Sequence, residues 1–554
     1  MKRLLPVLVC LVAACKPAPS TGVAVFEGFT YEGRDAVYAA HPLPGPDAAY
    51  NPILPGWYSD PSLCTNGEGD YFLVTSTFSY FPGVPLFHSR DLLNWTQVGH
   101  VLDRPSQLTG LGRQHTSGGI YAPDIKYNPK NRTYYMITTN VGTGNFLVKT
   151  QNPFGAWSEP ILLPQVKGID PSLFFDDDGR AYIVNNDDAP GGKPEYDGHR
   201  TIRIVEYDVE RDCTIGERKV IVDKGVRPED KPIWIEGPHL YKIDGKYYLM
   251  CAEGGTSDQH SEVIFRSDSP MDGYKPWNRN PILTQRHLAA DRPDPVTCTG
   301  HADIVRTPEG EWWGVFLGCR PLQSGFENLG RETFLMKVRW SEDGFPFFTE
   351  GDETVPLMIR RPGVTVGDHP VFGNFKVEDP FDGDRLGMAW MTLRGPADGW
   401  CTLRGGALEL KCSPARATKF ETPALVLRRL QHHAFTASTR MRFIPEGTEE
   451  AGMLLYKDER HQYFLKVCMQ DGDPAVVVEK VGAGTDVLGC ALLPEKWSVL
   501  DLSVASDDGQ TFRFQCAVDG ADPMTVAQGV DASYLSTAVS GGFTGTTIGL
   551  YAVK

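Results

Sequence analysis

The stretch DPSLCTNGEGDYFLV (60–74) decides the fold, because it combines an Asp-Pro start, an Asn-Gly turn and an aromatic strand. Four further starts follow along the chain: APDI (122–125), DPSL (170–173), GPHL (237–240) and HADI (301–304). Each of them precedes a turn and a strand with aromatic residues, namely YYMI (134–137), YIV (182–184), YYLM (247–250) and WWGV (312–315). Gly or Asn in such turns supplies the positive φ that tight hairpins need.

The period of this repeat indicates the architecture. The second residues of the five starts are separated by 62, 48, 67 and 64 residues, at positions 61, 123, 171, 238 and 302. A strand–turn–strand unit at such a period is the signature of a β-propeller, in which four-stranded blades surround a central channel. The sequence predicts a five-bladed β-propeller over residues 45–365.

A different pattern occupies the C-terminal third. Alternating segments such as FTASTRM (435–441), QYFLKV (462–467) and FRFQC (512–516) predict an antiparallel β-sandwich over residues 375–554. The chain is therefore expected to be all-β, with the propeller followed by the sandwich.

The first 20 residues have the features of an export signal and a tether. A basic start at residues 1–3 precedes the apolar run 4–11, which is too short to cross a bilayer, and small residues then lead to Cys15. This segment resembles that of bacterial lipoproteins, with lipidation at Cys15. It predicts an exported protein of the bacterial cell envelope, in the periplasm or at the outer membrane, that touches the membrane only through its lipid. A plain secretory signal is the alternative.

Composition excludes several classes of protein. The net charge of −16 argues against nucleic acid as a partner, since phosphate binding needs a basic face. None of the 12 cysteines forms a CxxC or similar pair, which argues against a zinc site. Cys401 and Cys412 are candidate disulfide partners across an expected hairpin, because an exported chain can form disulfides.

Three repeats carry a carboxylate at or beside the start of the innermost strand: Asp60, Asp170 and Glu236. Equivalent strand starts converge at one end of a propeller channel, and acids buried together shift one another's pKa values apart. Glycosidic hydrolysis needs such a pair, separated by roughly 6.5–9.5 Å in inverting enzymes. A single Asp-Pro is more simply a turn, but three acids at equivalent points favour catalysis. The residues alone do not rank acid against base.

These features belong to longer segments, including NPILPGWYSDPSL (51–63), GIDPSLFFDDDGRAYIV (168–184), WIEGPHLYKIDGKYYL (234–249) and GRETFLMKVRW (330–340). In this order they resemble glycoside hydrolase family 43, specifically its β-xylosidase and α-L-arabinofuranosidase group. The segment GGFTGTTIGLYA (541–552) resembles the concanavalin-like C-terminal domain of the same group.

The resemblance implies roles for particular residues. Asp60 is the expected general base, Glu236 the general acid, and Asp170 the residue that orients Glu236 and raises its pKa. The implied substrate contacts come from Arg331, which would bind sugar hydroxyls, and from Phe78, Tyr121, Thr256, His301 and Phe543.

The resemblance also bears on metal binding. It places His301 beneath the active site, where a structural Ca²⁺ in the channel would be held through water. A hydrogen-bonded core histidine is the alternative interpretation, and no cofactor is expected for the chemistry. Tyr121 stands where relatives often have Trp, which affects the expected sugar preference.

The combined prediction is an inverting hydrolase that removes terminal β-D-xylose from xylan or xylo-oligosaccharides, with hemicellulose oligosaccharides as partners. An α-L-arabinofuranosidase acting on arabinoxylan or arabinan is the first alternative, and a non-catalytic carbohydrate-binding propeller is the second. The sandwich is expected to close the site through Phe543. The sequence leaves the oligomeric state open.

Overall fold

The computed structural model describes residues 21–322, 325–368 and 370–554, and nearly all of its regular structure is β-strand. The expected signal segment and Cys15 lie outside the described residues. The α-helices in the described ranges are short: α1 (Ala36–Ala40) and α2 (Thr537–Ser540). None of them is long and apolar enough to cross a membrane. The expectation of an all-β chain is confirmed.

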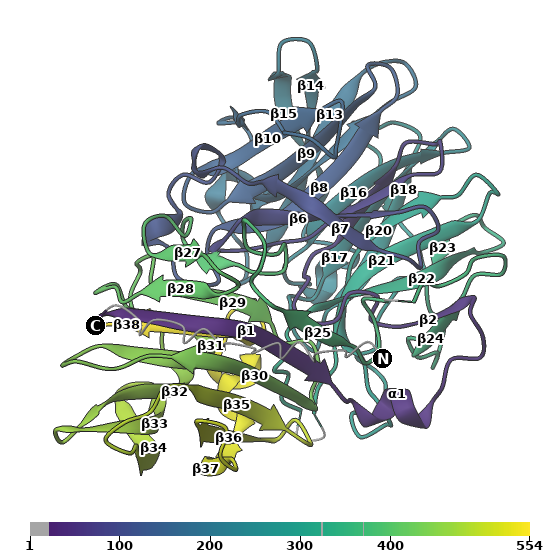
Figure 1. Ribbon diagram of the computed structural model, residues 1–554. Helices are drawn as coiled ribbons and strands as arrows, with labels where there is room; N and C mark the ends of the chain where they lie inside the picture. Colours follow the sequence, from purple (N-terminus) through teal and green to yellow (C-terminus); the bar gives the residue numbers. More distant parts are fainter. Residues whose placement is uncertain (1–20, 323–324, 369) are drawn as a thin grey trace, which may run out of the picture.

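Five antiparallel four-stranded sheets follow one another along the chain (Figure 1). Their strands are β3 (Ser62–Thr65), β4 (Tyr71–Val74), β6 (Gly83–Ser89) and β7 (Thr96–Leu102); β8 (Ile120–Asn128), β9 (Thr133–Asn140), β10 (Gly144–Thr150) and β11 (Ile161–Leu162); β12 (Ile169–Phe175), β13 (Ala181–Asp188), β14 (Arg200–Asp208) and β15 (Cys213–Asp223); β16 (Glu236–Ile243), β17 (Lys246–Glu253), β18 (Ser261–Ser267) and β19 (Lys275–Pro276); β20 (Thr297–Arg306), β21 (Trp312–Cys319), β22 (Glu332–Trp340) and β23 (Pro346–Phe347).

The first strands of the five sheets form a closed ring. Strand β3 contacts β8, β8 contacts β12, β12 contacts β16, β16 contacts β20, and β20 contacts β3 again. Four of these strands contain a repeated start of the sequence, and β3 begins within the fifth start, 60–63. The ring therefore brings the five starts to one axis, although they lie far apart in the chain.

The backbone is irregular at the same point of several first strands. The register shifts between Tyr121 and Asp124 in β8, between Ile169 and Ser172 in β12, and between Glu236 and His239 in β16. Strand β20 has equivalent irregularities on both sides of Gly300. A bulge bends a strand and redirects the neighbouring side chain. Asp60, Asp170 and His301 each have a φ near +50°, which is strained for a residue with a Cβ.

Most of the remaining strands form two further large sheets (Figure 1). The first contains β1 (Val23–Gly33), β25 (Lys376–Asp379), β27 (Cys401–Leu403), β28 (Leu408–Lys411), β30 (Phe435–Arg442), β35 (Leu500–Ser506), β36 (Thr511–Val518) and β37 (Met524–Asp531). The second contains β29 (Leu425–Arg429), β38 (Thr547–Val553), β31 (Glu450–Asp458), β32 (His461–Gln470), β33 (Asp473–Val481) and β34 (Thr485–Leu492). One hydrophobic cluster joins both sheets, so they form a sandwich.

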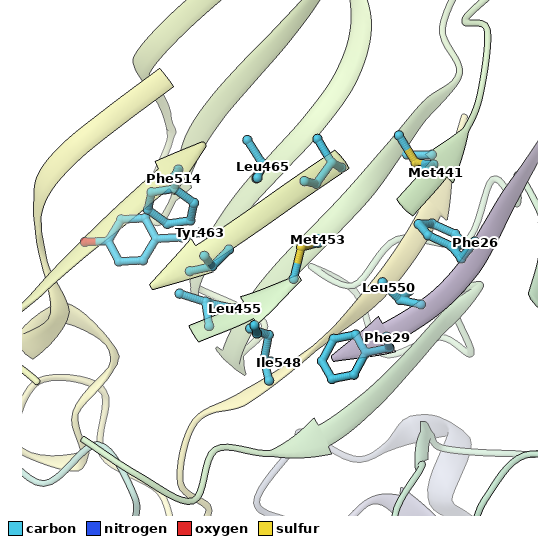
Figure 2. Packing of buried hydrophobic residues seen from close by; sticks show 14 of the residues in the cluster. Phe26, Phe29, Met441, Met453, Leu455, Tyr463, Leu465, Phe514, Ile548 and Leu550 are labelled. Carbon is cyan, nitrogen blue, oxygen red and sulfur yellow. The ribbon is translucent and has the colours of Figure 1, made fainter. Parts of the chain in front are cut away.

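Strand β1 comes from the N-terminus but belongs to the sandwich. It lies between β28 and β30, and Val25 is paired with Arg442 (Figure 1). A bulge between Phe26 and Phe29 places both rings on the buried face, although their spacing of three would otherwise put them on opposite faces. Figure 2 shows both rings beside Leu550 of β38. This strand lies outside both predicted domains, 45–365 and 375–554.

Two short strand pairs complete the fold. Strand β2 (Ala48–Tyr50) pairs with β24 (Met358–Arg360), and β5 (Tyr80–Phe81) pairs with β26 (Thr392–Leu393). Strand β5 lies between β4 and β6 of the first of the five sheets, and β26 lies between β25 and β27, so the second pair joins the ring of sheets to the sandwich.

The proposed pairing of Cys401 with Cys412 is wrong in this structure. Both are free thiols, as are the other cysteines of the described residues. Strand β27 places Cys401 opposite Leu410, so the hairpin register does not bring the two cysteines face to face.

Candidate active site

Three buried carboxylates gather where the first strands begin. Asp170 lies in β12, Glu236 begins β16, and Asp60 lies two residues before β3. Their charges act on one another: Asp60 raises the pKa of Asp170, and both aspartates raise the pKa of Glu236. The backbone amide of Gly237 donates to Asp170 Oδ2 over 3.1 Å, so Asp170 is bound to the peptide that follows Glu236.

Asp60 is held in its ionised form. Burial alone would raise its pKa, but the Arg331 guanidinium, 3.1 Å from Oδ1, and the nearby His301 lower it below the usual range. Ser76 Oγ donates to Asp60 Oδ2 over 2.6 Å and lowers the pKa further. Opposite charge and donated hydrogen bonds both favour a carboxylate.

Asp170 and Glu236 are shifted in the other direction. Burial and the charge of Asp60 raise the pKa of Asp170 to about 7. Burial, followed by the charges of Asp170 and Asp60, raises the pKa of Glu236 well above its usual value. One cluster therefore contains a carboxyl whose pKa is lowered, Asp60, and one whose pKa is raised well above its usual value, Glu236, which is the pairing that general acid–base chemistry needs.

Two histidines lie next to Asp60. His301 Nδ1 is 3.6 Å from Asp60 Oδ1, and burial lowers the pKa of His301 to about 4. His260 Nδ1 donates to the carbonyl of Cys298 over 2.8 Å, and burial lowers its pKa to about 4 as well. Both rings are neutral at pH 7. The sequence analysis predicted His301 and missed His260, which lies in a loop between β17 and β18, outside every repeat start.

The sandwich reaches this site through the loop that contains Phe543. The Arg331 guanidinium carbon lies 5.3 Å from the centre of the Phe543 ring. The backbone approach is close, because a Cβ on Gly330 would lie 2.6 Å from the amide nitrogen of Gly545. The amide of Thr546 also donates to the carbonyl of Asn328 over 2.8 Å. The loop is therefore attached to the segment that carries Arg331.

The predicted aromatic residues form one group with Phe543. The ring centres of Phe78 and Tyr121 are 5.7 Å apart, and Phe543 lies 6.1 Å and 5.6 Å from them. Phe78 is only 1% exposed, whereas Tyr121 and Phe543 are half-buried. Phe78 thus supports the other two rings from behind. Thr256 is half-buried in the loop after β17, and no hydrogen bond in the described part of the chain joins it to the acids.

A second polar layer lies in the ring of first strands. Ser62, Asp124, Ser172, His239 and Asp303 each occupy the third position of a repeat start, two residues beyond the first position. Alternate residues of a strand face the same side. These positions were not predicted as site residues from the sequence, although the repeat itself was the signal that could have identified them.

The ligand atoms of Asp124, His239 and Asp303 lie within 4.8 Å of one another, which is a spacing that could hold a metal ion. The Lys126 ammonium, however, lies 3.0 Å from Asp124 and 2.8 Å from Asp303. A divalent cation does not fit beside an ammonium that already binds the same two carboxylates. His301 is not part of this ligand group.

Comparisons with known proteins agree with this geometry. The model of glycosyl hydrolases family 43 matches residues 49–346, and that of the β-xylosidase C-terminal concanavalin A-like domain matches residues 378–554. The chain is 38% identical to a xylosidase/arabinosidase of Butyrivibrio fibrisolvens over 91% of its length and 95% of the relative. It is 36% identical to a non-reducing end α-L-arabinofuranosidase of Bacteroides ovatus, and the alignment covers 91% of this chain and 90% of that protein.

Solved structures give the same result. A GH43_12 protein retrieved from a capybara gut metagenome superposes with a TM-score of 0.89 at 42% identity, covering 96% of this chain and 99% of that one. A xylan β-1,4-xylosidase of Bacillus halodurans superposes with a TM-score of 0.80 at 33% identity, covering 91% and 96%. The chain therefore belongs to glycosyl hydrolase family 43 and is a glycosidase.

Proposed function

We propose that this glycosidase removes terminal β-D-xylose units from xylan or xylo-oligosaccharides with inversion at the anomeric carbon. The observation that carries the proposal is the opposite shift of two pKa values in one buried cluster: the pKa of Asp60 is lowered, which favours its carboxylate, and the pKa of Glu236 is raised well above its usual value, which favours its protonated form. An inverting glycosidase needs one carboxylate as base and one carboxylic acid as acid.

Each residue has one part in the proposed reaction. Asp60 takes a proton from a water molecule as the water oxygen forms a bond to the anomeric carbon. Glu236 gives its proton to the glycosidic oxygen as the bond between that oxygen and the anomeric carbon breaks. The charge of Arg331 favours the carboxylate form of Asp60 before the reaction, and burial together with the charge of Asp170 favours the protonated form of Glu236.

The sugar preference rests on the relatives, which include proteins named β-xylosidase and xylosidase/arabinosidase. The match to a non-reducing end α-L-arabinofuranosidase supports arabinofuranosidase activity on arabinoxylan or arabinan as the second candidate. Tyr121, Phe543 and Thr256 are the proposed contacts to the sugar, together with Arg331, and Phe78 would act through the half-buried rings of Tyr121 and Phe543.

The test is the release of nitrophenol from aryl β-xyloside and aryl α-L-arabinofuranoside, with Glu236→Ala as the control. Activity that the control loses would support the hydrolase, and the ratio of the two rates would identify the pentose. Proton NMR of the first sugar released from xylobiose would decide the stereochemistry, because inversion yields α-xylose. Activity on neither aryl glycoside would direct attention to other glycans, or to carbohydrate binding alone.

We also propose the finer description of the architecture. The ring of five sheets would be a five-bladed β-propeller over residues 45–365, and residues 375–554, completed by β1, would be the sandwich. The closed contacts of the first strands support this description. The proposed site lies where the sandwich loop meets the ring, so the sandwich would complete the site.

Export as a bacterial lipoprotein is a further part of the proposal. The basic start, the short apolar run and Cys15 support lipidation and a place in the cell envelope. Incorporation of labelled palmitate in a bacterial host, compared between the natural chain and Cys15→Ser, would test it. Equal labelling of both chains would contradict lipidation at Cys15.

A further inference from the structure

A lysine side chain lies among the acids of the second polar layer. Lys126 belongs to β8, and its ammonium lies 3.0 Å from Asp124 Oδ1 and 2.8 Å from Asp303 Oδ2. Its side chain is 16% exposed, and the two carboxylates are almost completely buried. Burial would lower the pKa of Lys126, but the two acids raise it above the usual range, so the side chain is charged.

The two acids join the first strands of different sheets. Asp124 of β8 accepts hydrogen bonds from Ser62 Oγ (3.0 Å) and from the amide of Leu173 in β12 (2.8 Å). Asp303 of β20 accepts from the amide of Leu63 in β3 over 3.0 Å and from Tyr241 Oη of β16 over 2.6 Å. All five first strands therefore contribute to one buried group of charges.

Buried carboxylates need a positive partner, because the cost of removing a charge from water is recovered only by pairing. Here the partner is the Lys126 ammonium, which extends from β8 and lies within 3.0 Å of both carboxylates. His239 Nδ1 lies 3.3 Å from Asp124 Oδ1 and makes no hydrogen bond within the described residues. His239 Nδ1 is thus the third possible metal ligand beside the two carboxylates.

We propose that the Lys126 ammonium is the permanent cation of this buried group of charges and occupies the position that a divalent metal ion would otherwise fill. A divalent ion beside Lys126 would place three positive charges against two carboxylates within about 3 Å of the ammonium, and the like charges would repel each other strongly. The ring of first strands is therefore held together without a metal ion. This inference concerns the stability of the ring and does not depend on the proposed function.

It follows that a divalent ion should be able to bind in place of the ammonium once the Lys126 side chain is removed. When the ammonium is removed, Asp124, Asp303 and His239 offer two carboxylates and one imidazole, a set that suits Mn²⁺ and also accepts Ca²⁺. Lys126→Ala removes the charge and opens space for an ion. Lys126→Met removes the charge but keeps most of the volume.

The experiment is thermal unfolding of the full chain after treatment with a chelator, with and without added CaCl₂ or MnCl₂. Lys126→Ala should unfold several degrees below the natural chain and recover most of this loss when either ion is added. Lys126→Met should lose similar stability and recover little. The natural chain should not respond, and neither should Lys242→Ala, the control, which removes a lysine that also pairs with two carboxylates, Asp176 and Asp177.

Two results would overturn the proposal. One is a folded Lys126→Ala chain that neither ion stabilises. The other is a natural chain that binds Ca²⁺ or Mn²⁺ in calorimetric titration and loses this binding in Asp303→Asn. The titration of the natural chain also decides the question if Lys126→Ala does not fold, because absence of binding there supports the lysine as the resident cation.

Discussion

Arg331 Nη1 lies 3.1 Å from Asp60 Oδ1, and the same guanidinium lies against the ring of Phe543 from the sandwich. One side chain thus contacts the proposed base and the second domain together. Its positive charge favours the carboxylate form of Asp60, and its position depends on the close packing of Gly330 against Gly545. Changes at either end of this contact are expected to have different consequences.

Replacing Arg331 with Gln should move the acid limb of the kcat/KM profile to higher pH. Without the guanidinium, the largest influence that lowers the pKa of Asp60 is lost, and a nearby opposite charge typically accounts for about 1–3 pH units. The pH dependence of xyloside hydrolysis measures the shift. Arg339→Gln, which removes an exposed partner of Glu353, is the matched control and should leave the limb in place. An unchanged limb in Arg331→Gln would contradict the assignment of Asp60 as base.

Replacing Asp170 with Asn should move the alkaline limb to lower pH. The negative charge of Asp170 raises the pKa of Glu236, so its removal lets Glu236 lose its proton more easily. The rate near the optimum should also fall, because Asp170 is bound to the peptide that follows Glu236. An alkaline limb that stays in place or moves to higher pH would show that Asp170 does not act through Glu236.

Phe543→Ala should raise KM for xylo-oligosaccharides by roughly two- to tenfold, the range expected for loss of one aromatic contact of about 0.5–1.5 kcal/mol. The unfolding temperature should change little, because the ring is only half-buried. Phe420→Ala is the control, since Phe420 is an exposed ring of the same domain that also has an arginine, Arg394, over it at 5.6 Å. An unaltered KM would show that Phe543 of the sandwich loop does not contribute to substrate binding.

Phe29→Ala should destabilise the sandwich by about 3–5 kcal/mol, as expected for removal of a fully buried aromatic side chain. Denaturant unfolding followed by intrinsic fluorescence should show this as an earlier transition. Phe154→Ala, in the part of the chain formed by the five sheets, removes an aromatic side chain that is 57% exposed and serves as the control. Equal stability of Phe29→Ala and the natural chain would mean that β1 is not needed for the sandwich to fold.

The sequence predicted those parts of the fold that repeat. The aromatic segment at 71–74 is β4 with the same bounds, and the other four aromatic segments lie within β9, β13, β17 and β21. The repeat also placed Asp60, Asp170 and Glu236 at equivalent positions, which is why three residues far apart in the chain could be grouped before their geometry was known. The ionisation states of these acids required the surrounding residues, since Ser76 and Arg331 act on Asp60 from other strands and loops.

Other features depend on contacts that no local pattern contains. Strand β1 is a short alternating segment whose partners begin more than 340 residues later, and nothing nearby in the sequence indicates where it pairs. Lys126 and His260 are single polar residues in ordinary surroundings until the ring closes. Their importance comes in large part from Asp303, which faces Lys126, and from the carbonyl of Cys298, which faces His260, and both of these lie on β20.

The place of β1 in the sandwich also constrains the order in which this protein can fold during synthesis. Strand β1 leaves the ribosome first, but its partners β25, β28 and β30 are translated only after all five sheets of the ring. Domains generally fold as units while the chain grows. The ring can therefore close while β1 is still unpaired, an exposed strand edge of the kind that promotes aggregation. The pairing of β1 with β25, β28 and β30 therefore has to wait until the ring has been synthesised, and a chaperone that holds the N-terminal segment would act during this interval.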